Sequence, residues 1–239
     1  ATPTPSSTFI FGGNGEDWCN YIAWNQVSNS FVVDGYTYST NFPYTNVLQN
    51  GQTTGGFVAS ISPDLTSITN CTMLGTGMRP FSLLTKTNGE IYCCNTLVSA
   101  AATAPITIGA YKSTNTGIDD RAIIGLSPSG QLLYGTFVNY CQGGLGGRIK
   151  ALLSIKEVNS CTQRFIGAVN PSSNTLYQTT SGVYQQTYPG GFPSAVYILQ
   201  TSHLDTTKIT ATPTCGEYMF QGTSTGVAPC NAVNYFYNF

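Results

Sequence analysis

The sequence has few charged side chains. Only 9 Lys and Arg and 10 Asp and Glu occur among its 239 residues, and the formal net charge is −1. Binding to DNA or RNA requires clustered Lys and Arg that neutralise phosphates, whereas the basic residues here are scattered singly. We therefore expect no nucleic-acid partner. Ser, Thr, Asn, Gln, Gly and Tyr must supply most of the polar surface.

Long apolar runs and C-x-x-C motifs are also missing. The least polar stretch, Val98 to Tyr111, is broken by Ser, Thr and Pro and is shorter than the roughly 20 apolar residues that span a bilayer, so we expect no membrane span. The chain starts ATPTPSSTF, as though an upstream segment had been removed, which favours a processed, exported protein. Eight cysteines without a C-x-x-C pair favour disulfides over zinc. We expect an extracellular or cell-surface location.

Catalytic groups are equally scarce. His203 is the only histidine, and no G-x-S-x-G or comparable nucleophile motif accompanies it. The acidic turns at Glu16-Asp17 and Asp119-Asp120 offer oxygen ligands for Ca²⁺, but short acidic turns more often cap nearby amides. We therefore predict no enzymatic activity, no cofactor and no metal site.

Short β-branched and aromatic runs recur throughout, bounded by Gly, Asn, Pro and Ser, and this pattern predicts an all-β fold. The window Arg148 to Val158 resembles a helix but also suits a strand, and its context favours a strand. The other predicted strands are Ser7 to Phe11, Tyr21 to Asn25, Ser30 to Tyr38, Gly56 to Ser62, Ser67 to Leu74, Phe81 to Lys86, Ile91 to Leu97, Ala122 to Ser127 and Gln131 to Tyr140.

The chain contains an internal repeat. Stretches that begin at Asn41 and Ala104 share a Pro-containing loop, a short apolar-aromatic segment, a turn, and a strand that ends in Ser-Pro before a further strand. The two Ser-Pro pairs, at Ser62 and Ser127, are 65 residues apart, and a looser third copy begins at Thr175.

Four strands per repeat is the layout of a β-propeller blade. Four segments resemble the SBBP-type β-propeller repeat of exported proteins, a seven-bladed family. They are Asp34 to Pro43, Gly56 to Pro63, Asp120 to Gly130 and Leu132 to Val138. The resemblance implies one propeller-like domain with approximate repeats 13–75, 76–142 and 143–218, the third of them degenerate. It implies little about activity, since a fold does not fix a function.

Three blades do not form a closed propeller, since closed propellers usually have at least four blades. Two terminal strands, 7–12 and 231–239, remain, and their edges must be covered or paired. The C-terminal strand places Val233, Tyr235, Tyr237 and Phe239 on one face. It pairs either with the N-terminal strand of its own chain or with a neighbouring copy by strand addition.

The cysteines follow the repeat. We expect Cys141–Cys161 and Cys215–Cys230 bridges, with Cys71 paired to Cys93 or Cys94 and the other of these two left for Cys19. Each bridge would stabilise the fold by about 2–4 kcal/mol. A thiol that bridges two subunits is the alternative. Asn70-Cys71-Thr72 is an N-glycosylation sequon, the only one in the chain.

These observations favour an extracellular structural protein that self-assembles into a filament, sheath or surface layer through its terminal strands. The partner is then a set of identical subunits. The alternative is a secreted glycan-binding or adhesive module, to which Tyr36, Tyr38 and Tyr44 would offer aromatic rings.

Overall fold

The computed structural model describes residues 7–49, 53–98, 102–108, 110, 113–115, 121–138, 148–159, 162–170, 195–202, 209–214 and 217–222, the last five ranges by backbone alone apart from Phe165 and Ile166. Over these ranges the chain forms strands and no helix. The all-β prediction is therefore confirmed. In the same ranges no helix is long and apolar enough to cross a membrane.

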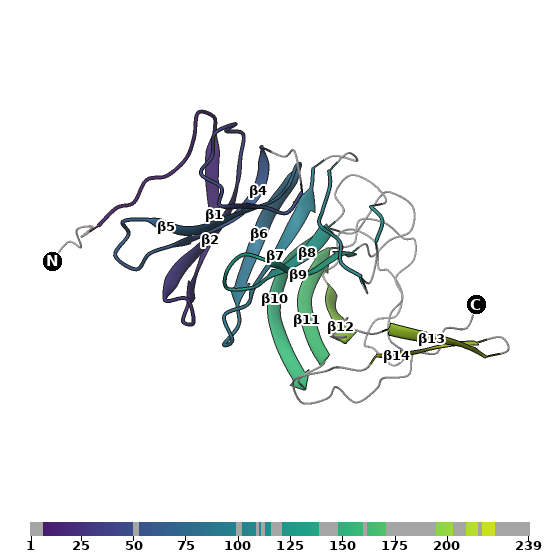
Figure 1. Ribbon diagram of the computed structural model, residues 1–239. Helices are drawn as coiled ribbons and strands as arrows, with labels where there is room; N and C mark the ends of the chain where they lie inside the picture. The colour runs from purple at the N-terminus through teal and green to yellow at the C-terminus, as the bar shows by residue number, and fades with distance from the viewer. Residues whose placement is uncertain are drawn as a thin grey trace. The chain divides into compact units, whose positions relative to one another are not determined.

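The first sheet, sheet A, has five strands in the order β1-β2-β4-β5-β3 (Figure 1). Its antiparallel strands are β1 (Asp17–Asn25), β2 (Ser30–Thr37), β4 (Gly55–Ile61) and β5 (Ile68–Gly75). The two-residue β3 (Asn46–Val47) lies parallel to β5 at one edge, and β1 forms the other edge. The predicted strand Tyr21 to Asn25 thus begins earlier, at Asp17.

The second sheet, sheet B, is a four-stranded antiparallel meander in chain order. Its strands are β6 (Met78–Thr85), β7 (Ile91–Leu97), β8 (Arg121–Leu126) and β9 (Leu132–Val138). Beside β9, the Thr107 amide donates to the Gly135 carbonyl over 3.0 Å. In sheet A, β3 lies in the same way beside β5.

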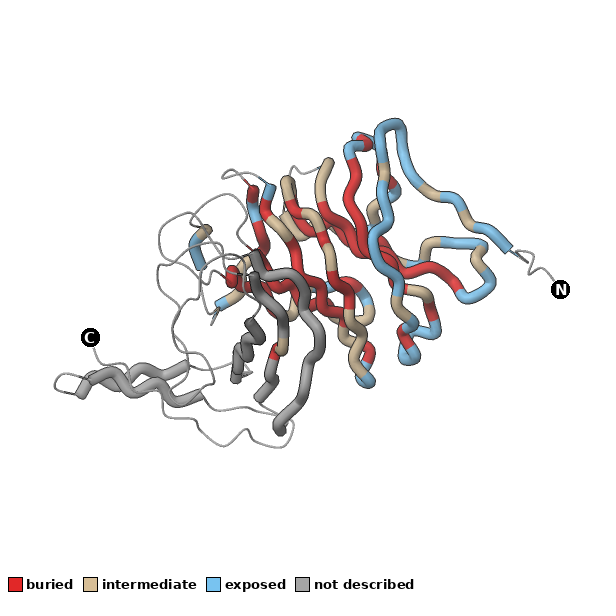
Figure 2. Tube along the Cα trace, turned by 180° about the vertical axis from the view of Figure 1, so that it is seen from behind, coloured by how far each residue is buried: buried red, intermediate tan, exposed pale blue. Residues whose placement is uncertain are grey.

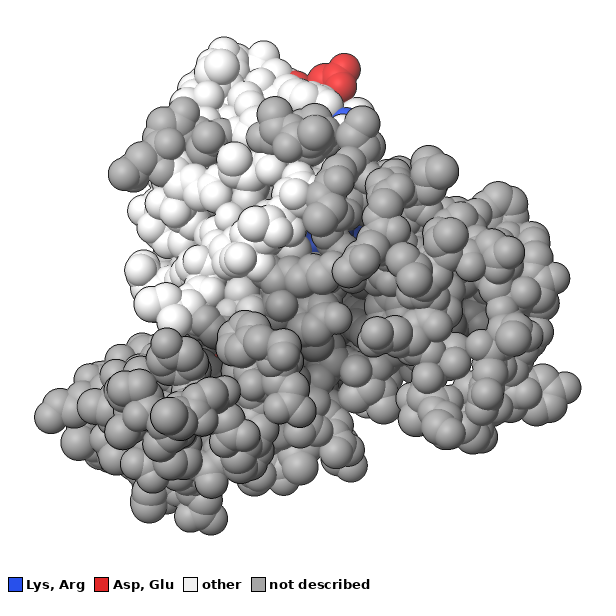
Figure 3. Space-filling model, turned by 90° about the vertical axis from the view of Figure 1, so that its right-hand side faces the viewer, with Lys and Arg blue, Asp and Glu red and all other residues white. Residues whose placement is uncertain are grey.

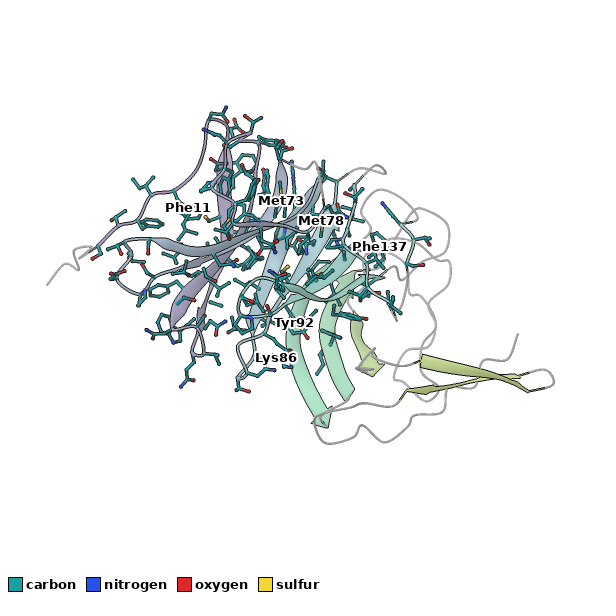
Figure 4. The ribbon with its side chains drawn as sticks, viewed as in Figure 1. Phe11, Met73, Met78, Lys86, Tyr92 and Phe137 are labelled. Carbon is teal, nitrogen blue, oxygen red and sulfur yellow. The ribbon has the colours of Figure 1, made fainter. Side chains whose placement is uncertain are left out.

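The two sheets pack face to face through one apolar core. Alternation along each strand sends Val32, Val58 and Leu74 from sheet A toward Ile124 and Phe137 of sheet B. Met78 lies within this core (Figure 4). We call the face of sheet A that meets sheet B its inner face and the opposite one its outer face.

The N-terminal segment covers the outer face of sheet A and is not a strand. Phe9 and Phe11 pack against a buried cluster that includes Phe42 and Phe57, and the Phe11 ring lies 5.9 Å and 6.1 Å from those two rings, centroid to centroid (Figure 4). The predicted N-terminal strand, 7–12, is therefore wrong as secondary structure. Alternation of apolar residues indicates which side chains turn inward, and here they pack without any ladder of hydrogen bonds.

The two Ser-Pro pairs occupy equivalent turns. The Ser62 amide donates to Ser67 O between β4 and β5, and the Ser127 amide donates to Gln131 O between β8 and β9, at 2.9 Å and 2.8 Å. Gly130 adopts φ +78° in the second turn, a conformation that favours glycine. The stretch from Asn41 to Gln49 crosses between β2 and β4, as the repeat predicts.

Later strands form smaller sheets. The strands β10 (Arg148–Asn159), β11 (Thr162–Asn170) and β12 (Ala195–Ser202) pair in that order, and β13 (Ile209–Thr214) pairs with β14 (Glu217–Gly222). The Arg148 window is thus a strand, as predicted. By contacts the chain divides into two compact units, Ala1–Ser154 with Ile166–Tyr197 and Ile155–Phe165 with Ile198–Phe239. Sheets A and B belong to the first.

The described cysteines are free thiols, and the predicted pairing of Cys71 with Cys93 or Cys94 is not formed. Cys71 belongs to the outer-face cluster of sheet A, whereas Cys93 lies in the core between the sheets. Cys94, the next residue along β7, points to the other side of sheet B. A whole sheet therefore separates Cys71 from either partner. Cys141, Cys161, Cys215 and Cys230 lie outside the described residues.

Candidate functional site

The candidate site begins at an irregularity in β1. Pairing with β2 shifts between Cys19 and Tyr21, so Asn20 is the extra residue of a β-bulge. Gly35 lies opposite, and a Cβ there would fall 1.8 Å from the Trp18 carbonyl oxygen. The amide of Tyr21 donates to Asp34 Oδ1 over 3.1 Å. Glycine thus allows the close approach, and Asp34 satisfies the amide that faces it.

Strand β6 has a second bulge at the matching place. Its pairing with β7 shifts between Pro80 and Ser82, which leaves Phe81 as the extra residue. Phe81 lies four residues before the end of β6, and Asn20 lies five residues before the end of β1, so the two bulges occupy similar places in their strands. Bulges re-aim side chains, and here Asn20 Nδ2 reaches across to donate to Pro80 O over 2.7 Å.

A cleft of about 620 Å³ lies between the two bulges. Small-molecule sites typically have roughly 300–1,000 Å³. The lining combines aromatic rings with amide and guanidinium groups, and includes Asn20, Tyr21 and Tyr36 from sheet A and Arg79, Phe81 and Arg121 from sheet B.

The Tyr36 ring and the Arg79 guanidinium line this cleft, and the rings of Trp18 and Tyr38 lie beside them. The Trp18 ring meets the Tyr36 ring edge-on with centroids 4.3 Å apart, and Tyr38 lies 5.5 Å from Tyr36. Arg79 Cζ lies 4.6 Å from the Tyr36 ring centroid, and Arg79 Nη2 donates to Tyr38 Oη over 2.8 Å. Trp18 is 46% exposed and Tyr38 52%, whereas Tyr36 is only 6% exposed. We call Trp18, Tyr36, Tyr38 and Arg79 the aromatic–arginine cluster.

Asp34 is buried directly behind this cluster. It is 0% exposed, and its Oδ2 has no hydrogen-bond partner. Burial raises the pKa of Asp34 to about 7, against a smaller opposite effect of the Tyr21 amide. Burial and, second, the Asp34 carboxylate raise the pKa of Cys93, which places the two groups within electrostatic range between the sheets. Asn95 Oδ1, also buried on β7, lacks a hydrogen-bond partner as well.

The buried thiols are unsuited to nucleophilic chemistry at neutral pH. Burial raises the pKa of Cys71 and of Cys94 to about 12 each. The thiolate is the reactive form, so these residues act as small apolar core residues. Among the described residues no group of three or more His, Cys, Asp or Glu side chains is placed to hold a metal ion.

The acidic turn at Asp17 is occupied by the protein's own donors. The Gly13 amide donates to Asp17 Oδ2 over 2.7 Å, and the Ser39 and Thr37 hydroxyls donate to Asp17 Oδ1. This is the capping arrangement that the sequence favoured over Ca²⁺. The second acidic turn, at Asp119-Asp120, lies outside the described residues, as does His203.

Of the three tyrosines predicted to offer rings to a glycan, two lie at the cleft and one does not. Tyr36 lines it and Tyr38 adjoins it through Arg79. Tyr44 instead packs on Phe42 at the outer face, and its hydroxyl donates to Thr53 O over 2.9 Å. Trp18 and Arg79 were not predicted, because they come from other strands and nothing in their local sequence marks them.

The sequon residue Asn70 lies in β5 and is half-buried. Its Nδ2, the atom that would carry a glycan, donates to Ser129 O over 2.6 Å. A glycan there would crowd the turn between β8 and β9, and its presence stays a prediction. The proposed assembly residues Val233, Tyr235, Tyr237 and Phe239 lie outside the described residues.

Comparison with known proteins gives no further guide. No family model and no curated protein matches the chain. The resemblance to the SBBP-type repeat therefore stays a prediction from the quoted segments.

Proposed function

We propose that this protein is an extracellular structural protein that assembles with copies of itself through its terminal strands. In this proposal sheets A and B are consecutive blades of an open, propeller-like array. Their face-to-face packing, the matching bulges at Asn20 and Phe81 and the equivalent Ser-Pro turns support that arrangement.

The observation that carries the proposal is the open edge at β1. Strand β1 is the edge of sheet A, it has nine residues, and it contains neither Lys nor Pro, the residues that usually block edge pairing. Ile22 is 66% exposed and Trp24 44%, both on the outer-face side. Figure 2 shows this strand exposed along most of its length, beside buried neighbours.

The other edges of sheets A and B are protected by comparison. Strand β3 has only two residues, β6 contains Pro80 and a bulge, and Thr107 lies against β9. Very short edges, prolines and bulges discourage further pairing. Along β1 the Thr85 hydroxyl donates to the Trp24 carbonyl over 2.9 Å. Strand β1 has a bulge of its own at Asn20 and one carbonyl, that of Trp24, already bound to Thr85, so strand addition is least hindered along the rest of β1.

The occupant that we propose is the segment 231–239 of a second copy. Its alternating Val233, Tyr235, Tyr237 and Phe239 would add apolar side chains beside Ile22 and Trp24, and main-chain hydrogen bonds would continue the sheet. The described part of the face in Figure 3 carries few charged side chains, and the formal net charge of −1 leaves little repulsion between copies.

A charge at the edge tests this proposal. Ile22→Lys places a cation where the incoming strand would pack, and we expect it to shift sedimentation from large species to the monomer at equal concentration. Gln131→Lys adds the same charge at an exposed position in the β8–β9 turn and serves as the control. Equal sedimentation of wild type and Ile22→Lys would rule out assembly through β1.

A second candidate function is glycan binding, and the aromatic–arginine cluster is the observation that favours it. Exposed Trp and Tyr rings pack against the C–H face of a sugar, while Asn20 and Arg79 offer hydrogen-bond donors to its hydroxyls. The site does not overlap the outer-face residues Ile22 and Trp24, so both functions are compatible in one molecule. Binding of oligosaccharides to immobilised protein tests it.

A further inference from the structure

We propose that the cleft between sheets A and B binds a short saccharide that bears a carboxylate, with Arg79 holding the carboxylate and Trp18 packing against the sugar ring. This inference rests on the second candidate function, glycan binding, and specifies its ligand class. It is independent of self-assembly, because the cleft lies on the inner-face side of β1.

The charge of Arg79 is the first argument. The only ion pair among the described residues joins Lys86 to Glu90, so no described carboxylate neutralises Arg79. Its guanidinium has five N–H donors, and only one is used, by Nη2 toward Tyr38 Oη. The remaining donors form the planar fork that matches a carboxylate in a bidentate arrangement.

The rigid placement of Arg79 is the second argument. The guanidinium stacks over the Tyr36 ring at 4.6 Å and is tied to Tyr38. Tyr36 in turn is held by Trp18 on one side and is almost fully buried. A cation fixed in this way loses little side-chain entropy when a ligand binds. A surface arginine that only improves solubility would not need such support.

The composition of the cleft is the third argument. Trp18 presents an exposed apolar ring beside the cleft, and Asn20 and Thr96 add polar groups to its lining. Arg121, a second guanidinium in the lining, lies over the Phe81 ring at 4.4 Å. An aromatic platform with amides suits a sugar ring, and the Arg79 guanidinium selects an acidic one over a neutral one.

Two described carboxylates lie near the cleft: Glu16, which is exposed and within electrostatic range of Tyr36, and Asp34 at the back. Asp34 lies behind the Tyr21 amide, and its carboxyl has a pKa raised by burial. Arg79, which lines the cleft and has no described carboxylate within ion-pair distance, supplies the positive charge that a ligand meets there. Phosphate-bearing ligands offer similar charge, and they serve as a comparison in the test.

The test is a titration calorimetry series with the full chain. The probes are a trimer of galacturonic acid, the matching trimer of galactose and inorganic phosphate. We expect the acidic trimer to bind at least tenfold more tightly than the neutral one, with no detectable heat for phosphate alone. Arg79→Gln should reduce affinity for the acidic trimer by about tenfold or more and affinity for the neutral trimer much less, because glutamine keeps an N–H donor but loses the charge.

Two further variants make the outcome decisive. Trp18→Ala should weaken the binding of both trimers. Lys86→Gln, which removes a cation remote from the cleft, should weaken the binding of neither. Thermal unfolding of each variant checks that it is folded. Equal affinity for the two trimers, or an Arg79→Gln variant that binds the acidic trimer as wild type does, would overturn the carboxylate inference and leave glycan binding intact. If neither trimer binds, both proposals fail. Heat from phosphate equal to that from the acidic trimer would show a general anion site and overturn the saccharide assignment.

Discussion

Asp34 is the residue whose environment differs most from that of a free side chain. It is fully buried on a central strand, with one oxygen bound to the Tyr21 amide and the other without a hydrogen-bond partner. A raised pKa means that the folded chain retains a proton that the unfolded chain has already lost. The free energy of unfolding should therefore fall as the pH rises from about 4 to about 7.

The variant Asp34→Asn tests this directly. Asparagine keeps the oxygen that accepts from Tyr21 and has no charge to bury. We expect the wild type to lose up to about 4 kcal/mol relative to Asp34→Asn between pH 4 and pH 7, with no further change above that range. Urea unfolding at several pH values measures the difference.

Other carboxylates make the free energy of unfolding rise with pH, but their contribution cancels when the wild type is compared with Asp34→Asn. Hydrogen bonds from Ser62 and Thr66 lower the pKa of Asp64, so its contribution grows as the pH rises. That contribution is the same in both proteins. Parallel pH profiles for the wild type and Asp34→Asn would contradict the assignment of a buried, protonated Asp34.

Gly35 supports the bulge on which the cleft depends. A Cβ at this position would meet the Trp18 carbonyl at 1.8 Å and the Phe57 ring at 2.8 Å. Because neither backbone nor packed ring can retreat, we expect Gly35→Ala to cost at least about 2 kcal/mol of stability and to displace Trp18. Thr87→Ala, at an exposed turn position, is the control. Unfolding midpoints within error of each other would show that the bulge adapts freely.

At the scale of the element, the N-terminal segment takes the place that a preceding sheet would occupy. Sheet B packs on the inner face of sheet A, while Phe9 and Phe11 pack on the outer face. The segment covers this face only partly, since Ile10, Ile22 and Trp24 remain exposed. One aromatic segment thus reduces the apolar area without closing the edge.

The neighbouring residues Ile10 and Phe11 form a matched pair for testing this element. Phe11→Ala should destabilise the fold by about 1–2 kcal/mol, because a partly buried ring is lost, and should expose Phe42 and Phe57. Ile10→Ala removes a side chain that is 89% exposed and should change stability little. Thermal unfolding compares the two. Equal effects would mean that the segment does not pack as described.

How far the sequence predicts these elements depends on the range of the interactions involved. Alternation and turn residues locate β2, β4, β5 and β7 to β9 within a few residues, because such patterns are local. The bulges at Asn20 and Phe81 have no local signal. Alternation also places Cys93 and Cys94 on opposite faces, but the sheet that separates Cys71 from both becomes evident only from the packing.

The residues of the cleft likewise have no local signal in the sequence. The arginine and aromatic residues that line the cleft come from positions 21, 36, 79, 81 and 121, and only the stacking of two sheets brings them together. The sequence predicted Tyr36 and Tyr38 as ring donors because tyrosines that occur with Asn and Gln are typical of sugar-binding surfaces. It predicted Tyr44 for the same reason, and that residue turned to the outer face.

For the whole molecule, the central claim is that copies of this chain complete one another. Sheets A and B share bulges, turns and crossing segments, yet among the described residues one edge of β1 pairs with no strand and part of the outer face stays uncovered. Such a stack is extended most simply by an identical unit, because a head-to-tail contact that does not close generates a filament.

Electron microscopy of the purified full chain at high concentration tests this claim most directly. The account predicts filaments or sheets with a regular subunit repeat for the wild type. It predicts only separate particles for Ile22→Lys and for a chain that ends at residue 230. Wild-type protein that stays as single particles at every concentration, with the β1 amides already protected from hydrogen exchange, would contradict it.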